Sequence, residues 1–322
     1  MKTLILKINE KNPEEKKIAE AAKIINNSGL VVFPTETVYG LGASAFDANA
    51  IKKIFKAKNR PMDNPLIVHI SKKEEVNLLS SKIPKVAWKL IDEFWPGPLT
   101  LVLKKKGIVP KEVTAGLDSV AIRMPKNKIA LALIEKSGPI AAPSANLSSK
   151  PSGTSVKHVI QDFKGKVDCI ISSRESEIGL ESTVLDLTGK PRILRPGAIT
   201  FEELIKILPN LEIITNSNQP KSPGMKYKHY APDAEVIIIE GEREVIRNKI
   251  KELIWQYKIK GDKFYVVDSE NPKKLARDLF KIFRSCDRMG YKYIIVPAVE
   301  EKGIGLAVMN RLRKAASKTI SV

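Results

Sequence analysis

The chain has 322 residues and a net charge of +19, from 55 lysines and arginines against 36 aspartates and glutamates. Its hydrophobic content of 43% is ordinary for a folded globular protein. No apolar run reaches the ~18 residues that a membrane helix needs, and the amino terminus turns polar and acidic too early for a secretory signal. The length predicts two domains, and we expect the protein to be cytoplasmic.

The net charge indicates which ligands the protein could bind, and the cysteines indicate whether it holds a zinc site or disulfides. A positive excess of this size favours nucleic acids or phosphates as partners, although a lysine-rich surface without a specific anion site would carry the same charge. Cys169 and Cys286 form no CxxC pair, so the sequence indicates neither a structural zinc site nor a disulfide framework. A single disulfide between these two cysteines stays open.

The first 208 residues predict a mixed α/β domain. LVVF (30–33) and LIVHI (66–70) are short apolar runs typical of buried strands, and Asn12, Pro13 and Glu15 form a start signal for a helix over 13–27. Further strands are expected at 3–8, 99–103, 119–123, 139–142, 168–172, 183–187 and 192–195. Further helices are expected at 48–57, 84–94, 127–137, 155–162 and 200–208.

A long linker and a second domain follow. Residues 209–234 lack sustained periodicity and hold four prolines, and irregular segments of this length are uncommon unless they are functional. Strands at 235–239, 263–267 and 293–297 then alternate with helices at 243–258, 272–286 and 304–316. This alternation predicts a three-stranded parallel sheet of Rossmann-like type in 235–322. No GxGxxG opens it, so dinucleotide binding is not indicated.

Two loop segments in the first domain carry polar groups where α/β proteins bind ligands. Residues 34–42 (PTETVYGLG) follow a buried strand and offer hydroxyls and a carboxylate, although a strand and turn with satisfied polar groups would look the same. Residues 56–65 (KAKNRPMDNP) could clamp phosphates through Lys58 and Arg60, or could be a solvated basic helix end.

Two further segments have the same double interpretation. Residues 143–155 (PSANLSSKPSGTS) form a hydroxyl and amide loop before a helix, suited to phosphate or simply to helix capping. Residues 222–232 (SPGMKYKHYAP) concentrate tyrosine, histidine and lysine inside the linker, where a tyrosine could stack on a base. Docking between the domains would use the same tyrosines.

Together these segments resemble the threonylcarbamoyl-AMP synthase family in its long form. The resemblance runs over about residues 10–232 and rests on PTETVYGLG, Lys58-Asn59-Arg60, AIRMP (121–125), PSAN and SPGMKYKHYAP, in that order. It implies a YrdC-like catalytic domain at 1–208, with a twisted mixed sheet, flanking helices and an open basic cavity. It further implies a linker acting as a lid over the active site at 209–234, and a small Rossmann-like parallel α/β domain at 235–322.

The resemblance also implies the reaction. L-threonine, bicarbonate and ATP would give threonylcarbamoyl-adenylate and pyrophosphate, with Mg²⁺ accompanying ATP and no organic cofactor. A downstream threonylcarbamoyl-transferase complex would then modify the tRNA adenosine beside the anticodon, and direct tRNA or double-stranded RNA binding is a further expectation. A carbamate carboxylate is already ionised and needs no strong general base, so a site rich in Lys, Arg, Ser, Thr and Asn suits the chemistry.

The implied site residues fall into two groups. The expected ATP-binding residues, of which the first four form the catalytic tetrad, are Lys58, Arg60, Ser144, Asn146, Asn64, Ser119, Ser152, Arg195 and Tyr230. The expected L-threonine-binding residues are Thr35, Thr37, His69, Arg123, Ala142 and Ser182, with Arg123 meeting the carboxylate.

Alternatives stay open for some of these residues. His69 could be a hydrogen-bonded core histidine, Ser182 could pin the turn before STVLDL, and Glu36 could orient its loop. Ser119 and Ser149 stand where the family usually has Thr and often has Gly, and the second change bears on the loop conformation around Ser152. A non-catalytic RNA-binding module is the alternative function. A carbamoyl-phosphate-using transferase would instead be active without ATP.

Overall fold

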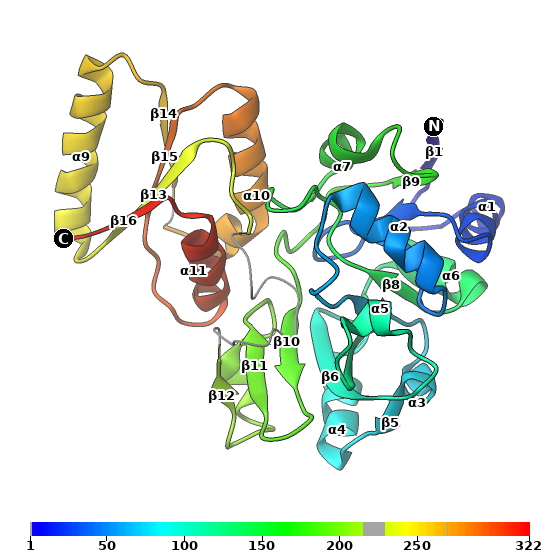
Figure 1. The fold of residues 1–322 in the computed structure, drawn as a ribbon. Coiled ribbons are helices and arrows are strands. Elements are labelled where there is room, and N and C mark those ends of the chain that lie inside the picture. Colours follow the sequence, from blue (N-terminus) through cyan, green and yellow to red (C-terminus); the bar gives the residue numbers. More distant parts are fainter. Residues whose placement is uncertain (1, 215–228, 269) are drawn as a thin grey trace. The chain divides into compact units, whose positions relative to one another are not determined.

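The structure is a computed structural model that describes residues 2–214, 229–268 and 270–322 (Figure 1). The chain divides into two compact units, one of Met1–Ser148 with Ser152–Lys226 and one of Ser149–Pro151 with Tyr227–Val322. We refer to them as unit 1 and unit 2. The predicted limits of the catalytic domain, linker and C-terminal domain stay predictions.

Unit 1 is built on a mixed sheet, which confirms the predicted fold class. Among the described residues twelve strands take part, in the order β1-β9-β2-β3-β8-β4-β7-β6-β10-β11-β12, with β5 paired to β6. These strands are β1 (Leu4–Lys7), β2 (Val31–Phe33), β3 (Gly40–Ser44), β4 (Ile67–His69), β5 (Ser80–Lys82), β6 (Leu99–Lys105), β7 (Ser119–Arg123), β8 (Ile140–Ala142), β9 (Cys169–Ser172), β10 (Thr183–Asp186), β11 (Arg192–Arg195) and β12 (Glu212–Ile213).

Helices flank this sheet. They are α1 (Glu15–Asn26), α2 (Ala48–Lys58), η1 (Lys73–Glu75), α3 (Val76–Leu79), α4 (Lys85–Phe94), α5 (Lys111–Thr114), α6 (Lys128–Ser137), α7 (Val156–Phe163) and α8 (Phe201–Leu204). The predicted helix start at Pro13 is wrong by two residues. The Glu14 carboxylate accepts a hydrogen bond from the Asn9 N–H, and Glu14 is held in an extended conformation at the N-cap.

Residues 30–33, which include strand β2, pack alternately into two hydrophobic cores. Leu30 and Val32 belong to the larger cluster, which includes residues of α2 and α7, whereas Val31 and Phe33 belong to a second cluster with residues of α1 and α6. Side chains alternate between the faces of a strand, so a run that is apolar at every position is buried on both faces. This explains why the apolar run LVVF (30–33) predicts a buried strand.

Unit 2 contains a parallel sheet with one strand more than predicted. Among its described residues the order is β14-β15-β13-β16, formed by β13 (Glu235–Glu240), β14 (Phe264–Val266), β15 (Tyr293–Pro297) and β16 (Lys318–Ser321). Its helices are α9 (Arg243–Ile259), α10 (Pro272–Arg288) and α11 (Ile304–Ala315). The sequence analysis missed β16, a largely exposed strand without an apolar run. It also missed β12, which lies inside the predicted linker.

Candidate active site

Most predicted site residues of unit 1 lie at strand ends or in adjoining loops, and almost all are buried. Polar and charged side chains are rarely buried without partners, so their contacts define the site. The residues with at most 9% exposure are Thr35, Thr37, Lys58, Arg60, Asn64, His69, Ser119, Arg123, Ala142, Asn146, Ser152, Ser182 and Arg195. Ser144 is half-buried.

The loop between β2 and β3 presents Thr35, Glu36 and Thr37. The two threonine hydroxyls lie 2.8 Å apart, and Thr35 Oγ1 donates to the Val38 carbonyl at 2.6 Å. The N–H groups of residues 178 and 179 donate to the carbonyls of Glu36 and Thr37. The backbone of this loop is therefore fixed from both sides, and its side chains are held in place within a buried region.

Arg123 ends β7 and reaches into this loop. Its Nη1 donates to Thr37 Oγ1 at 2.9 Å, its Nε donates to the Gly97 carbonyl at 3.2 Å, and its Nη2 lies 2.7 Å from Glu36 Oε1. Both charged side chains are about 4–5% exposed. Glu36 thus pairs with and neutralises Arg123, and whether it orients its loop stays a prediction.

His69 ends β4, beside Arg123 in the parallel register of β4 and β7. Its Nδ1 lies 3.2 Å from the Ile67 carbonyl, and its ring meets the Phe33 ring edge-on at 6.0 Å. Burial, and secondarily the positive charge of Arg123, lower the pKa of His69 to about 3. The imidazole is therefore neutral near pH 7.

Ser182 and Arg195 form a second cluster. Arg195 ends β11, donating from Nη2 to Ser182 Oγ at 3.1 Å and from Nε to the Ser182 carbonyl at 3.0 Å. Thr100 of β6 places its hydroxyl 2.7 Å from that of Ser182. The chain at Gly197 lies against the backbone of Ser182 and Thr183, where a Cβ would lie 2.3 Å from the Thr183 nitrogen, so this close backbone contact requires glycine.

The predicted catalytic tetrad divides into a group of three linked residues, Lys58, Ser144 and Asn146, and Arg60, which contacts a different loop. Lys58 ends α2, and its Nζ donates to the backbone carbonyls of Ser144 and Asn146, while Ser144 Oγ donates to Asn146 Oδ1 at 2.6 Å. Arg60 donates from Nη2 to the carbonyls of Asn64 and Pro65, at 3.1 and 3.2 Å. In this structure the two cations therefore shape the loops that carry the other predicted residues.

The comparisons with known proteins agree on one family. A family model described as "Telomere recombination" (Sua5, YciO and YrdC) matches residues 23–197, and one described as "Threonylcarbamoyl-AMP synthase, C-terminal domain" matches residues 199–317. The threonylcarbamoyl-AMP synthase of Pyrococcus abyssi is 51% identical, with 99% of each chain covered. That of Bacillus subtilis is 42% identical, with 96% of this chain and 95% of the relative covered.

The chain belongs to the threonylcarbamoyl-AMP synthase family. Among solved structures, that of P. abyssi Sua5 complexed with L-threonine superposes with a TM-score of 0.96 at 51% identity, covering 99% of this chain and all of the other. Escherichia coli YciO is 27% identical, with a TM-score of 0.57, and covers 64% of this chain and 99% of its own. The predicted family is thus confirmed.

Two buried polar residues that contact predicted site residues were not predicted from the sequence. Glu181 is 5% exposed and accepts a hydrogen bond from Ser152 Oγ at 2.5 Å, and Thr100 is fully buried against Ser182. An acidic residue within the apolar, strand-like run LESTVLDL was the available signal for Glu181. Thr100 gave no signal of its own, because a β-branched hydroxyl is common in strands.

Three further predicted residues take no part in the hydrogen bonds described above. Ser119 begins β7, so it lies roughly 13 Å along the strand from Arg123 at about 3.3 Å per residue. Ala142 ends β8 opposite Ile67. Tyr230 belongs to unit 2, where its ring is buried and stacks on Phe280 at 5.2 Å. Of the fourth predicted segment, 222–228 lie outside the described residues. The assigned ligand roles stay predictions.

No group of three His, Cys, Asp or Glu side chains that could hold a metal ion occurs among residues 2–214, 229–268 and 270–322. In the same part of the chain no helix is long and apolar enough to cross a membrane. Cys169 and Cys286 are both free thiols, and burial raises the pKa of Cys169 to about 12.

Proposed function

We propose that this protein is a threonylcarbamoyl-AMP synthase, which makes threonylcarbamoyl-adenylate and pyrophosphate from L-threonine, bicarbonate and ATP. The product serves the threonylcarbamoyl-adenosine modification of tRNA next to the anticodon. Family membership over both domains supports the assignment, as does the relative whose structure holds L-threonine. The observation that carries it is the buried Arg123–Glu36–Thr37 cluster.

This cluster suits a small amino acid. A guanidinium held by Glu36, Thr37 and the Gly97 carbonyl is preorganised to meet a carboxylate, and hydrogen bonds to an ionised group are the strong ones. The hydroxyls of Thr35, Thr37 and Ser182 and the neutral imidazole of His69 offer polar contacts without adding charge. They would surround the threonine side chain and its amino group.

The loops held by Lys58 and Arg60 suit the nucleotide. Asn64 Oδ1 is buried and accepts no hydrogen bond from the described residues, so it is a polar atom available to a ligand. ATP would be positioned while the carbamate carboxylate attacks its α-phosphate. The residues that would position it are Lys58, Arg60, Asn64, Ser119, Ser144, Asn146, Ser152 and Arg195. Catalysis would then rest on positioning and on charge neutralisation. Tyr230 would cover the nucleotide.

The decisive experiment is threonine-dependent release of pyrophosphate by the purified protein with ATP, bicarbonate and Mg²⁺. We expect release with L-threonine, and a loss of about 100-fold or more for Lys58→Ala, because two loop carbonyls lose their common donor. Lys56→Ala, on the exposed side of the same helix end, is the matched control and should keep activity. Absence of threonine-stimulated release would refute the proposal. Phosphate release from carbamoyl phosphate on addition of L-threonine, in the absence of ATP, would favour a carbamoyl-phosphate-using transferase.

Partners and setting complete the proposal. Mg²⁺ would enter with ATP, because Mg²⁺ is usually held by substrate phosphates and one or two carboxylates. We expect a threonylcarbamoyl-transferase complex to consume the product in the cytoplasm. The net charge of +19 supports direct tRNA contact, which a salt-dependent gel shift would test.

A further inference from the structure

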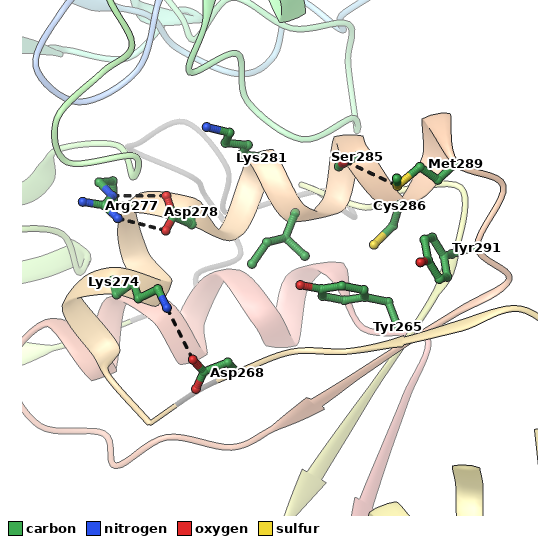
Figure 2. A pocket seen from close by; sticks show the side chains of 11 residues that line it. Tyr265, Asp268, Lys274, Arg277, Asp278, Lys281, Ser285, Cys286, Met289 and Tyr291 are labelled. Atoms are coloured by element: carbon green, nitrogen blue, oxygen red, sulfur yellow. Dashed lines mark hydrogen bonds and ion pairs between the residues drawn. The ribbon is translucent and has the colours of Figure 1, made fainter. Parts of the chain in front are cut away.

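Unit 2 contains a groove that the proposed reaction does not use. It has a volume of about 470 Å³ and runs between α10 and the edge strand β14 (Figure 2). Small-molecule sites usually occupy about 300–1,000 Å³. The lining residues are Tyr265, Asp268, Lys274, Arg277, Asp278, Lys281, Ile282, Ser285, Cys286, Met289 and Tyr291.

One end of the groove is aromatic and apolar. Tyr265 and Tyr291 approach edge to face with ring centroids 5.7 Å apart, and Cys286 and Met289 lie beside them in Figure 2. Met289 is 55% exposed and Tyr265 is 37% exposed, so apolar surface at this end is accessible to solvent. Faces of this kind take a flat ring by stacking and sulfur contact.

The other end is ionic. Lys274 lies in the first turn of α10, 3.4 Å from Asp268, while Arg277 makes a bidentate contact with Asp278 through Nε and Nη2, both at 3.1 Å. These pairs hold the two cations at the rim, and the positive end of the α10 dipole lies at this end as well. With Lys281, the lining carries three cations against two carboxylates.

This combination selects a class of ligand. An inorganic anion would leave the aromatic end uncovered, and a purely apolar ligand would leave the cations without a counter-charge. A nucleoside monophosphate satisfies both ends, with a ring to stack and a phosphate to meet lysine and arginine. Asp268 supplies a carboxylate of the kind that accepts ribose hydroxyls in nucleotide-binding α/β folds.

We propose that the groove between α10 and β14 is a second nucleotide site, which binds a nucleoside monophosphate with its base toward Tyr265 and Tyr291 and its phosphate toward Lys274, Arg277 and Lys281. All its lining residues belong to unit 2. The lining contains none of the proposed catalytic residues, and the site gives the C-terminal domain a ligand of its own.

Photolabelling of the full-length protein with 8-azido-AMP tests the proposal. We expect labelled peptides within residues 263–291, with labelling that saturates and is competed by AMP at least about tenfold more effectively than by adenosine or by inorganic phosphate. The charge reversal Lys274→Glu should weaken this labelling about tenfold, because it replaces a phosphate donor by a repelling carboxylate. Lys251→Glu on α9, an exposed lysine outside the groove, is the matched control.

The outcomes separate this proposal from the proposed function. Labelling confined to peptides outside 263–291, or equal labelling of the groove in Lys274→Glu and Lys251→Glu, would overturn it. Labelling of unit 1 is expected in addition and is counted separately by peptide. Threonine-dependent pyrophosphate release should remain within about twofold in Lys274→Glu, so a failed synthase assay with intact groove labelling would refute only the proposed function.

Discussion

The ion pair of Arg123 and Glu36 allows a quantitative test of the proposed threonine site. Both side chains are about 4–5% exposed, and Nη2 of Arg123 lies 2.7 Å from Oε1 of Glu36. Removing one partner of such a pair leaves a buried charge uncompensated, which costs about 3–5 kcal/mol. Arg123→Met additionally removes the donors to Thr37 and to the Gly97 carbonyl, so we expect its cost to lie near the upper end of that range.

The double variant distinguishes a coupled pair from two independent contributions. Glu36→Gln alone should lower the free energy of unfolding by about 3 kcal/mol. When Arg123→Met is already present, the same substitution removes a buried charge that has lost its partner, so it should cost much less. The combined loss should then fall about 2–3 kcal/mol short of the sum of the single losses. The exposed pair Lys136–Glu15, with side chains 38% and 81% exposed, is the control and should show coupling of at most about 1 kcal/mol.

Urea unfolding followed by tryptophan fluorescence measures these costs. Trp88 and Trp95 lie in unit 1, whereas Trp255 lies in unit 2 and is 66% exposed, so a Trp255→Phe background restricts the signal to the unit of interest. Calorimetric titration with L-threonine should in parallel show loss of binding for Arg123→Met. Additive losses of stability in the Arg123–Glu36 cycle, or unchanged threonine binding in Arg123→Met, would refute the reasoning.

Three further predictions concern the histidine, a glycine and the loop serine. The pKa of His69 is lowered to about 3 in the folded state, so protonation of His69 favours unfolding. The free energy of unfolding should therefore fall by up to about 1.4 kcal/mol per pH unit as the pH drops from about 6.5 toward 3. His69→Gln should flatten this part of the pH profile of urea midpoints, and an unchanged profile would contradict the assignment. Gly197→Ala should lower the free energy of unfolding by about 2 kcal/mol or more and should lower pyrophosphate release, because the new Cβ meets backbone 2.3 Å away. Gly189→Ala is the control: a Cβ there meets no atom within 4 Å, so neither the free energy of unfolding nor pyrophosphate release should change. Ser149, with φ of 68°, adopts the left-handed conformation that glycine favours. Ser149→Gly should therefore raise the free energy of unfolding by about 0.5–1 kcal/mol, and a decrease would count against strain at this position.

Local pattern determined most of the elements. Apolar runs such as 30–33 and 66–70 specified buried strands, because a strand covered on both faces must be apolar at every position. The family motifs likewise marked the loops that hold Thr35 and Asn146 and the end of α2 that holds Lys58. The conformation at Ser149 adds a physical reason for the glycine that the family often has there.

Other elements escaped because their stability is not local. The strand β3 covers Gly40–Ser44, a glycine-rich segment that pairs with β2 on one side and β8 on the other. A Cβ at Gly42 would lie 2.5 Å from the Ile140 side chain, so glycine is used there for close packing rather than for a turn. Similarly, β16 joins the second sheet only through its partner β13.

The sequence by itself determined the family and the α/β class, and it supplied the set of polar residues proposed for the reaction. Tertiary structure alone decided how those residues pair: Glu36 with Arg123, Thr100 with Ser182, and Lys58 with the carbonyls of residues 144 and 146. It also brought the rings of Tyr265 and Tyr291 together at one end of the groove of unit 2. The physical reason is the same in each case, because partners far apart in the chain meet only through the sheet register and helix packing that the whole fold fixes.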